Sequence, residues 1–163
     1  MNEGNMSTAI KGAIGEFYVA SFLSALNLVV ALPRGGVPSS DLLVTTSEGK
    51  KTISLQVKTA LSRNFTKSKK YEDYYSWPVS EQAKDSHGES HWYAFVNMNN
   101  WPGPVNAEQP DIYFVDSETV AHVVKDWNDK PSPRIFFRIK DVEKEHYKGL
   151  AGFEKMKEVL TRR

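Results

Sequence analysis

The segment ISLQVKTA, residues 53–60, alternates apolar and polar side chains, and this period of two restricts the fold more than any other feature of the chain. In an extended strand, side chains two positions apart lie on the same face. One face would carry Ile53, Leu55 and Val57, and the other Ser54, Gln56 and Lys58. The alternation predicts a strand with one buried face. Its polar face is either simply solvated or the floor of a site.

Length and composition predict one domain over residues 1–163. The chain has 163 residues, 40% of them hydrophobic, which is enough for one core and short for two. No apolar run approaches the roughly 20 residues that a transmembrane helix needs, and the N-terminus lacks the basic-then-apolar order of a secretory signal. The absence of cysteine excludes disulfides and thiolate sites and fits a reducing compartment. We expect a soluble, cytoplasmic protein that does not associate with membranes.

The remaining patterns predict an α/β fold. Ser7 and Thr8 can cap a helix with a wide apolar surface that extends to about Asn27. Turn residues 47–50 join a strand at 41–45 to the ISLQVK strand as a hairpin. The other predicted elements are strands at 28–32, 92–97 and 112–115, a short helix at 79–84, a helix from Asp116 to about Trp127, an edge strand at 135–139 and one or two helices between 141 and 162. Residues 61–90 otherwise read as polar and irregular.

Positive charge is concentrated after the hairpin, although the net charge is only +1. No acid occurs between residues 50 and 70. Phosphate affinity depends on how many cations reach the backbone, so a local cluster matters more than the total charge. The candidate nucleic-acid contacts are Lys50, Lys51, Arg63, Lys67, Lys69 and Lys70. The alternative is a solvated basic loop.

Aromatic residues alternate with these cations. They are Phe65, Tyr71, Tyr74, Tyr75 and Trp77. Aromatic rings mixed with cations can stack on bases and hold phosphates, so this segment is the candidate DNA-contacting loop. The alternative is that half of the rings cover the core or a subunit interface.

Three polar residues are predicted to converge at the hairpin. Asp41 opens one strand, and Gln56 and Lys58 lie on the polar face of the other. A carboxylate beside an amide oxygen can form part of a shell for Mg²⁺, which prefers oxygen ligands and keeps several waters. A nearby lysine can hold a phosphate or help to deprotonate a water. This set of groups suits metal-assisted hydrolysis of a phosphodiester.

Glu16 is unusual because it lies in an otherwise apolar helix. Burying a carboxylate costs several kcal/mol unless it is paired or bound to a metal. Gly12 and Gly15, at the same end of the helix, allow another backbone to approach closely. The alternative is that Glu16 lies on the exposed edge of the helix.

The order of a helical Glu16, Asp41 at a strand start and Gln56-Val57-Lys58 on the next strand resembles the PD-(D/E)xK nuclease superfamily. Within it, the chain is most similar to small endonucleases of the branch that includes a homing endonuclease encoded by a group I intron. The resemblance covers about the first 60 residues in detail and the later elements in pattern. It implies a restriction-endonuclease-like core, a mixed sheet flanked by helices, and Mg²⁺-dependent cleavage of DNA, with Mn²⁺ as an alternative metal.

The resemblance also implies a role for each matching residue. Asp41 would be the main metal ligand, Gln56 a ligand through its side-chain oxygen, and Val57 a ligand through its backbone carbonyl. Lys58 would position or activate the attacking water. Glu16 would bind a second metal or hold the first through a bound water. Cutting both strands requires two sites, so a homodimer or homotetramer is expected.

Two positions depart from the family pattern. Gln56 stands where the family usually has an acid. Glutamine keeps an acceptor oxygen but lacks the negative charge, so metal affinity should fall and metal binding should depend more on Asp41 and Glu16. Ser40 precedes Asp41 where a proline is usual, and Pro38 lies two residues further back. The replacement at Gln56 leaves an alternative function open, namely a catalytically inactive protein of nuclease fold that binds nucleic acid or serves as an interaction module.

Overall fold

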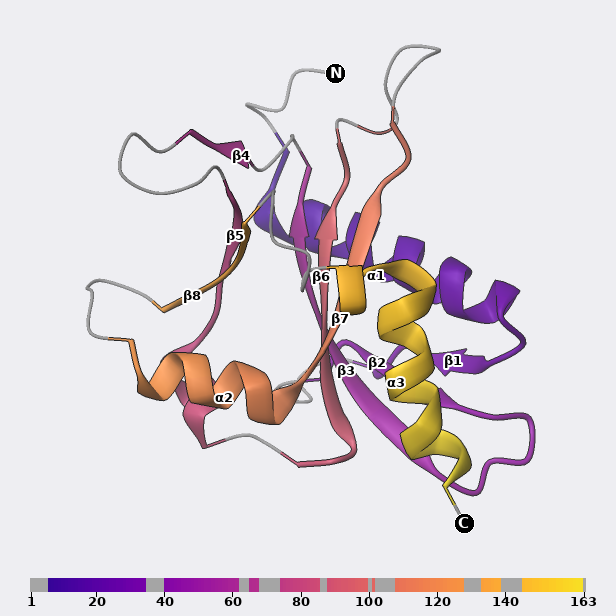
Figure 1. Cartoon of the computed structure of the whole chain (residues 1–163). Helices are drawn as coiled ribbons and strands as arrows, with labels where there is room; N and C mark the ends of the chain where they lie inside the picture. Colours follow the sequence, from indigo (N-terminus) through magenta and orange to yellow (C-terminus); the bar gives the residue numbers. More distant parts are fainter. Residues whose placement is uncertain are drawn as a thin grey trace.

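The computed structural model describes residues 6–34, 40–61, 65–67, 74–85, 88–99, 101, 108–127, 133–138 and 145–162 (Figure 1). The elements, in chain order, are α1 (Thr8–Ala25), β1 (Val29–Ala31), β2 (Leu42–Thr45), β3 (Thr52–Ala60), β4 (Phe65–Thr66), β5 (Tyr74–Pro78), the 3-10 helix η2 (Glu81–Lys84), β6 (His91–Asn97), β7 (Asp111–Asp116), α2 (Ser117–Lys125), β8 (Arg134–Arg138) and α3 (Gly149–Thr161).

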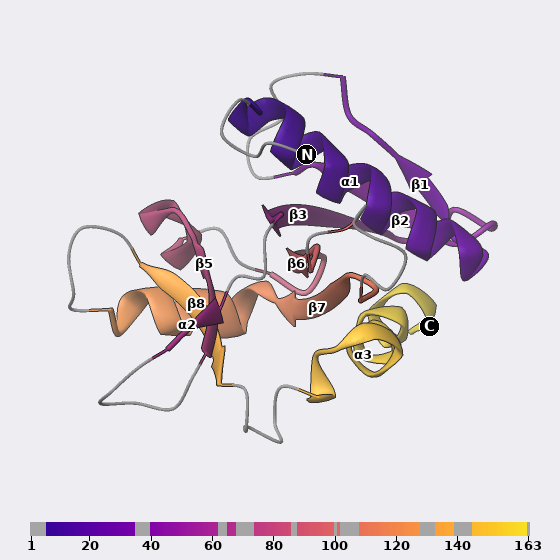
Figure 2. The same ribbon diagram turned by 90° about the horizontal axis from the view of Figure 1, so that it is seen from above.

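The larger sheet has the strand order β1-β2-β3-β6-β7. Its neighbours pair antiparallel except β3 and β6, which are parallel, so the sheet is mixed. Seen from above, α1 and α3 lie on one side of this sheet, and α2, β5 and β8 lie on the other (Figure 2). Each side encloses its own cluster of buried apolar side chains. The predicted α/β class, with a mixed sheet flanked by helices, is confirmed.

Helix α1 begins and ends where its sequence indicates. The Ser7 hydroxyl accepts a hydrogen bond from the Ile10 N–H at 3.3 Å and caps the first turn. Asn27 follows the helix with a φ of 64°, a left-handed conformation that asparagine tolerates better than most residues. Along the helix, Gly15, Val19 and Leu23 are buried at intervals of four residues, which sets the face that packs on the sheet.

The predicted hairpin is confirmed. Strands β2 and β3 pair antiparallel with Leu42 opposite Leu55, and Gly49 has a φ of 66° in the connecting turn. The alternation in β3 is also confirmed, because Ile53, Leu55 and Val57 are buried whereas the three polar residues between and after them are half-buried. The strands predicted near 28–32, 92–97 and 112–115 correspond to β1, β6 and β7.

The prediction of an irregular segment over residues 61–90 is wrong at β5. This strand lies between β4 and β8 in a second, three-stranded sheet. Tyr75 and Trp77 are 8% and 1% exposed, and the Trp77 indole N–H donates to the Val96 carbonyl at 3.0 Å. Both rings therefore belong to the core and not to a DNA-contacting loop. The pattern was misread because the partner strand β8 lies about sixty positions later in the chain.

The C-terminal elements close the two cores. Asp116 caps α2 by accepting a hydrogen bond from the Thr119 N–H at 2.8 Å, as the sequence predicts. Helix α3 contributes Phe153, Met156 and Leu160 to the cluster beneath α1. Among the helices of the described ranges, none has both the length and the apolar character needed to cross a membrane.

Candidate functional site

The candidate site lies beside β3, in the gap that is left where this strand extends past the start of β2. The paired part of β2 begins at Leu42, opposite Leu55, whereas β3 continues to Ala60. Beyond Leu55, β3 pairs with β6 on one side only, as far as the described residues show. The backbone groups of β3 that point away from β6 are therefore available here to other partners.

The Asp41 carboxylate occupies this gap. The Asp41 N–H donates to the Leu55 carbonyl at 3.0 Å, and one carboxylate oxygen, Oδ2, accepts from the Val57 N–H at 2.7 Å. Since the N–H and C=O of one strand residue point to the same neighbour, the Val57 carbonyl also faces the gap. The resemblance implies that this carbonyl and Asp41 are both metal ligands. The Val57 carbonyl points to the side of β3 on which Asp41 lies, as such a role would require.

Gln56 and Lys58 flank Val57 on the opposite face from the buried residues of β3, and both are half-buried. Burial lowers the pKa of Lys58, and the negative charge of Asp41 opposes that effect. Lys58 thus lies within electrostatic reach of Asp41. Within the described residues, the structure shows no hydrogen bond between Gln56 and Asp41.

Glu16, on α1, feels the charge of the same carboxylate. The helix lies very close to β3, because a Cβ built on Gly15 would fall 1.8 Å from the Thr59 Oγ1. Glu16 is half-buried, and its pKa is raised first by that burial and second by the charge of Asp41. Glu16 is therefore neither fully exposed nor fully buried, and the charge of Asp41 acts on it.

The four predicted side chains come from three parts of the chain, namely α1, the residue before β2, and β3. Asp41 bonds to the strand that carries Gln56 and Lys58, and its charge acts on both Lys58 and Glu16. The available donors are carboxylate, amide and carbonyl oxygens, the types that Mg²⁺ prefers. No group of three or more His, Cys, Asp or Glu side chains in the described ranges is arranged to hold a metal.

The predicted basic contacts are spread along the chain. Lys50 and Lys51 are exposed in the turn before β3, at the opposite end of that strand from Lys58, and Lys50 pairs with Glu48 at 2.6 Å. With a strand rise of about 3.3 Å per residue, Lys51 lies about 23 Å from Lys58. Lys67 is exposed after β4. The remaining three candidates, Arg63, Lys69 and Lys70, lie outside the described residues.

The close contact between Gly15 and Thr59 is the site feature that the sequence did not identify. The glycine was expected to permit a close approach, but its partner was not predicted. A signal was present, since Gly15 directly precedes Glu16 and Thr59 directly follows Lys58. Both contact residues are therefore next to a proposed site residue.

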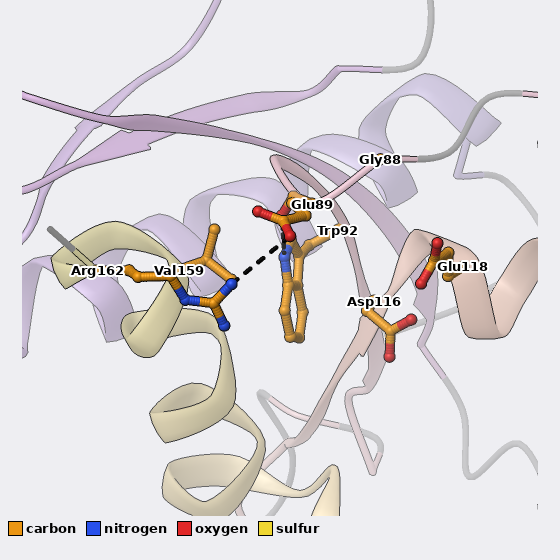
Figure 3. Close-up of a pocket in the computed structure, with 7 residues that line it drawn as sticks. All are labelled: Gly88, Glu89, Trp92, Asp116, Glu118, Val159 and Arg162. Carbon is orange, nitrogen blue, oxygen red and sulfur yellow. Dashed lines mark hydrogen bonds and ion pairs between the residues drawn. The ribbon is translucent and has the colours of Figure 1, made fainter.

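A pocket of about 140 Å³ lies elsewhere, between the start of β6 and the end of α3 (Figure 3). The side chains of Glu89, Asp116 and Glu118 lie around it, and Arg162 pairs with Glu89 at 3.6 Å. None of the predicted site residues lines this pocket. It is separate from the gap that holds Asp41.

The chain is similar to a solved structure of a bacterial homing endonuclease, I-Ssp6803I, with a TM-score of 0.56. The match covers 93% of each chain at 17% sequence identity. No protein-family model and no curated protein matches the chain. At this identity the likeness shows a shared fold, a mixed sheet flanked by helices.

Proposed function

We propose that the protein is a metal-dependent endonuclease of PD-(D/E)xK type that hydrolyses phosphodiester bonds in DNA. The observation that supports this most directly is the hydrogen bond from the Val57 N–H to the Asp41 carboxylate, which holds that acid beside the strand of Gln56 and Lys58. The charge of Asp41 also acts on Glu16 and Lys58. The fold shared with a homing endonuclease over 93% of both chains is a second, independent support.

The residues fit a divalent cation. Burial first and the charge of Asp41 second raise the pKa of Glu16, so the two carboxylates repel each other. A cation between them would remove that repulsion. Asp41, Gln56 and the Val57 carbonyl would hold Mg²⁺, with Glu16 binding directly or through water. When bound, the metal supplies charge that stabilises the phosphoryl oxygens and makes water more acidic.

Lys58 has a defined task in this proposal. Its ammonium group lies on the polar face of β3 and is partly desolvated, which lowers its pKa. A partly desolvated cation interacts strongly with a phosphate or a water beside it. Lys58 would orient the attacking water toward the phosphorus and exchange a proton with it. The partner is DNA, and two copies of the chain would be needed to cut both strands.

The test is plasmid nicking with and without Mg²⁺ or Mn²⁺. Asp41→Asn keeps an oxygen that can accept from the Val57 N–H, so the fold should be retained while nicking falls at least roughly 100-fold. Lys58→Met keeps the length of the side chain and should reduce nicking by roughly 100-fold or more. Lys125→Met, at an exposed lysine of α2 that is not among the candidate contacts, is the matched control. Nicking that persists unchanged in Asp41→Asn would contradict the proposal.

A second function is an inactive nuclease fold that only binds nucleic acid. It is favoured by Gln56 in place of an acid and by the lack of a third acidic or histidine ligand among the described residues. Salt-dependent DNA binding by a protein that never nicks, with either metal, would support this second function.

A further inference from the structure

The outer face of the smaller sheet presents aromatic rings to solvent. Strands β5 and β8 pair with Ser76 opposite Phe136 and Tyr74 opposite Arg138. The alternate residues of both strands are buried in the second core cluster. Phe136 is 45% exposed and Tyr74 is half-buried, and their ring centroids lie 6.1 Å apart in an edge-to-face arrangement. Two neighbouring strands thus hold a pair of rings on one surface.

Basic residues occur in or next to the same three strands. Strands β4, β5 and β8 contain two arginines and no acid, and the exposed Lys67 directly follows β4. Arg134 donates from Nε to the Ser76 hydroxyl at 3.1 Å and from Nη2 to the Ser76 carbonyl at 3.2 Å. Within the described part of the chain, these bonds use two of its five N–H donors and leave three for an anion.

Acids occur in the sequence on both sides of these strands. Glu72 and Asp73 directly precede β5 and Asp141 follows β8, and all three lie outside the described residues. Glu81 begins η2 and is exposed. The three strands themselves therefore complement a negatively charged ligand.

We propose that the outer face of the β4-β5-β8 sheet binds an unpaired stretch of the DNA substrate. Phe136 would stack on a base, and Arg134 and Lys67 would contact backbone phosphates. The inference rests on the proposed function, because it identifies where the strand of the nuclease substrate lies. It adds a preference for DNA with unpaired bases.

The chemistry of the face favours unpaired over paired DNA. Phenylalanine has no hydrogen-bonding group, so in a groove it can contact only apolar groups such as the thymine methyl. Full stacking of its ring on the face of a base requires that the base is unstacked from its neighbour. Flat sheets with exposed rings and flanking cations bind single strands in this way. A protein partner would instead have to supply carboxylates to avoid burying unpaired arginine.

Fluorescence anisotropy in Ca²⁺, with a labelled single strand and the duplex of the same sequence, tests the inference. Phe136→Leu keeps an apolar side chain without a flat ring and should weaken single-strand binding about fivefold or more. Phe136→Tyr keeps the ring and should bind as the unmodified protein does. Duplex affinity should change less than twofold in both variants. Leu150→Ala, which alters an exposed apolar residue of α3, is the control.

A salt titration tests the phosphate contacts separately. Lys67→Gln should reduce the slope of log affinity against log salt by about 0.7 for the single strand. An unchanged slope would contradict the contact at Lys67. Equal single-strand affinity in Phe136→Leu and Phe136→Tyr would overturn stacking, even if plasmid nicking still depends on Asp41. If the unmodified protein neither nicks nor binds either DNA, the proposed function fails and this inference fails with it.

Discussion

The contact between Gly15 and Thr59 makes a sharp prediction, because one methyl group should disturb both the fold and the site. In Gly15→Ala, the new Cβ would lie 1.8 Å from the Thr59 Oγ1 and 2.9 Å from both Cβ and Cγ2 of that threonine. These atoms belong to a β-branched side chain on a paired strand and cannot rotate away easily. To restore 3.0 Å, the shortest separation that real Cβ atoms show, α1 and β3 must part by about 1.2 Å.

The cost follows from what α1 contributes to the core. Val19 and Leu23, both fully buried, move with the helix. Forcing extra volume into a packed contact costs about 1–3 kcal/mol. Alanine recovers about 1 kcal/mol of helix propensity relative to glycine. We therefore expect Gly15→Ala to lower the free energy of unfolding by up to about 2 kcal/mol.

Gly12→Ala is a matched control in the same helix. Its added Cβ would meet only the Glu16 Oε1, at 3.6 Å, which is an ordinary contact. This variant should gain about 0.5–1 kcal/mol of stability from helix propensity alone. Urea denaturation followed by circular dichroism measures both values. Thr59→Ala, combined with Gly15→Ala, should recover part of the loss because it removes the nearest atom.

The result that would refute this reasoning is specific. If Gly15→Ala is as stable as Gly12→Ala, helix and strand do not approach as closely as the structure indicates. In that event, the position of Glu16 beside Asp41 would lose its structural basis too. If Gly15→Ala is destabilised and also nicks DNA less at temperatures where it is fully folded, the contact positions Glu16.

Three further predictions address other parts of the molecule. Trp77→Phe removes the hydrogen bond to the Val96 carbonyl and should lower the free energy of unfolding, measured by urea denaturation, by about 1–3 kcal/mol. An unchanged stability would mean that this bond does not join the two sheets. Burial lowers the pKa of His91 below 6.5, more than its hydrogen bond to Ser54 raises it. As the pH falls, the unfolded chain therefore protonates at His91 before the folded chain does, and the stability of the fold should fall below about pH 6.5. His91→Gln should reduce this loss of stability, as measured by thermal melts between pH 7.5 and 5.5. Gln56→Glu adds a charged ligand and should lower the Mg²⁺ concentration needed for half-maximal nicking; an increase would show that residue 56 does not face the metal.

Elements whose partners are near in sequence could be predicted without the structure. The Ser7 cap, the apolar stripe of α1 and the hairpin joining β2 to β3 depend on residues a few positions apart. The same locality explains why Asp41 and the polar face of β3 could be assigned to one site. Strand β5 could not be recognised, because Tyr75 and Trp77 become core residues only when β8 and β6 pack around them.

The hydrogen-bond partner of His91 illustrates the same limit. His91 is a strand residue whose Nδ1 lies 2.8 Å from the Ser54 Oγ. That neighbour comes from β3, thirty-seven positions away. Spacing alone does not reveal such a partner.

By itself, the sequence determined the local elements and the chemical groups available to a site, because caps, turns and alternating burial arise from neighbouring residues. Only the tertiary structure decided that the charge of Asp41 acts on Glu16, because the packing of Gly15 against Thr59 brings α1 close to β3. The tertiary structure also decided which aromatic rings are buried and which, like Phe136, remain on the surface. The physical reason is that burial and electrostatic coupling depend on distances in space, which pairing between remote strands sets.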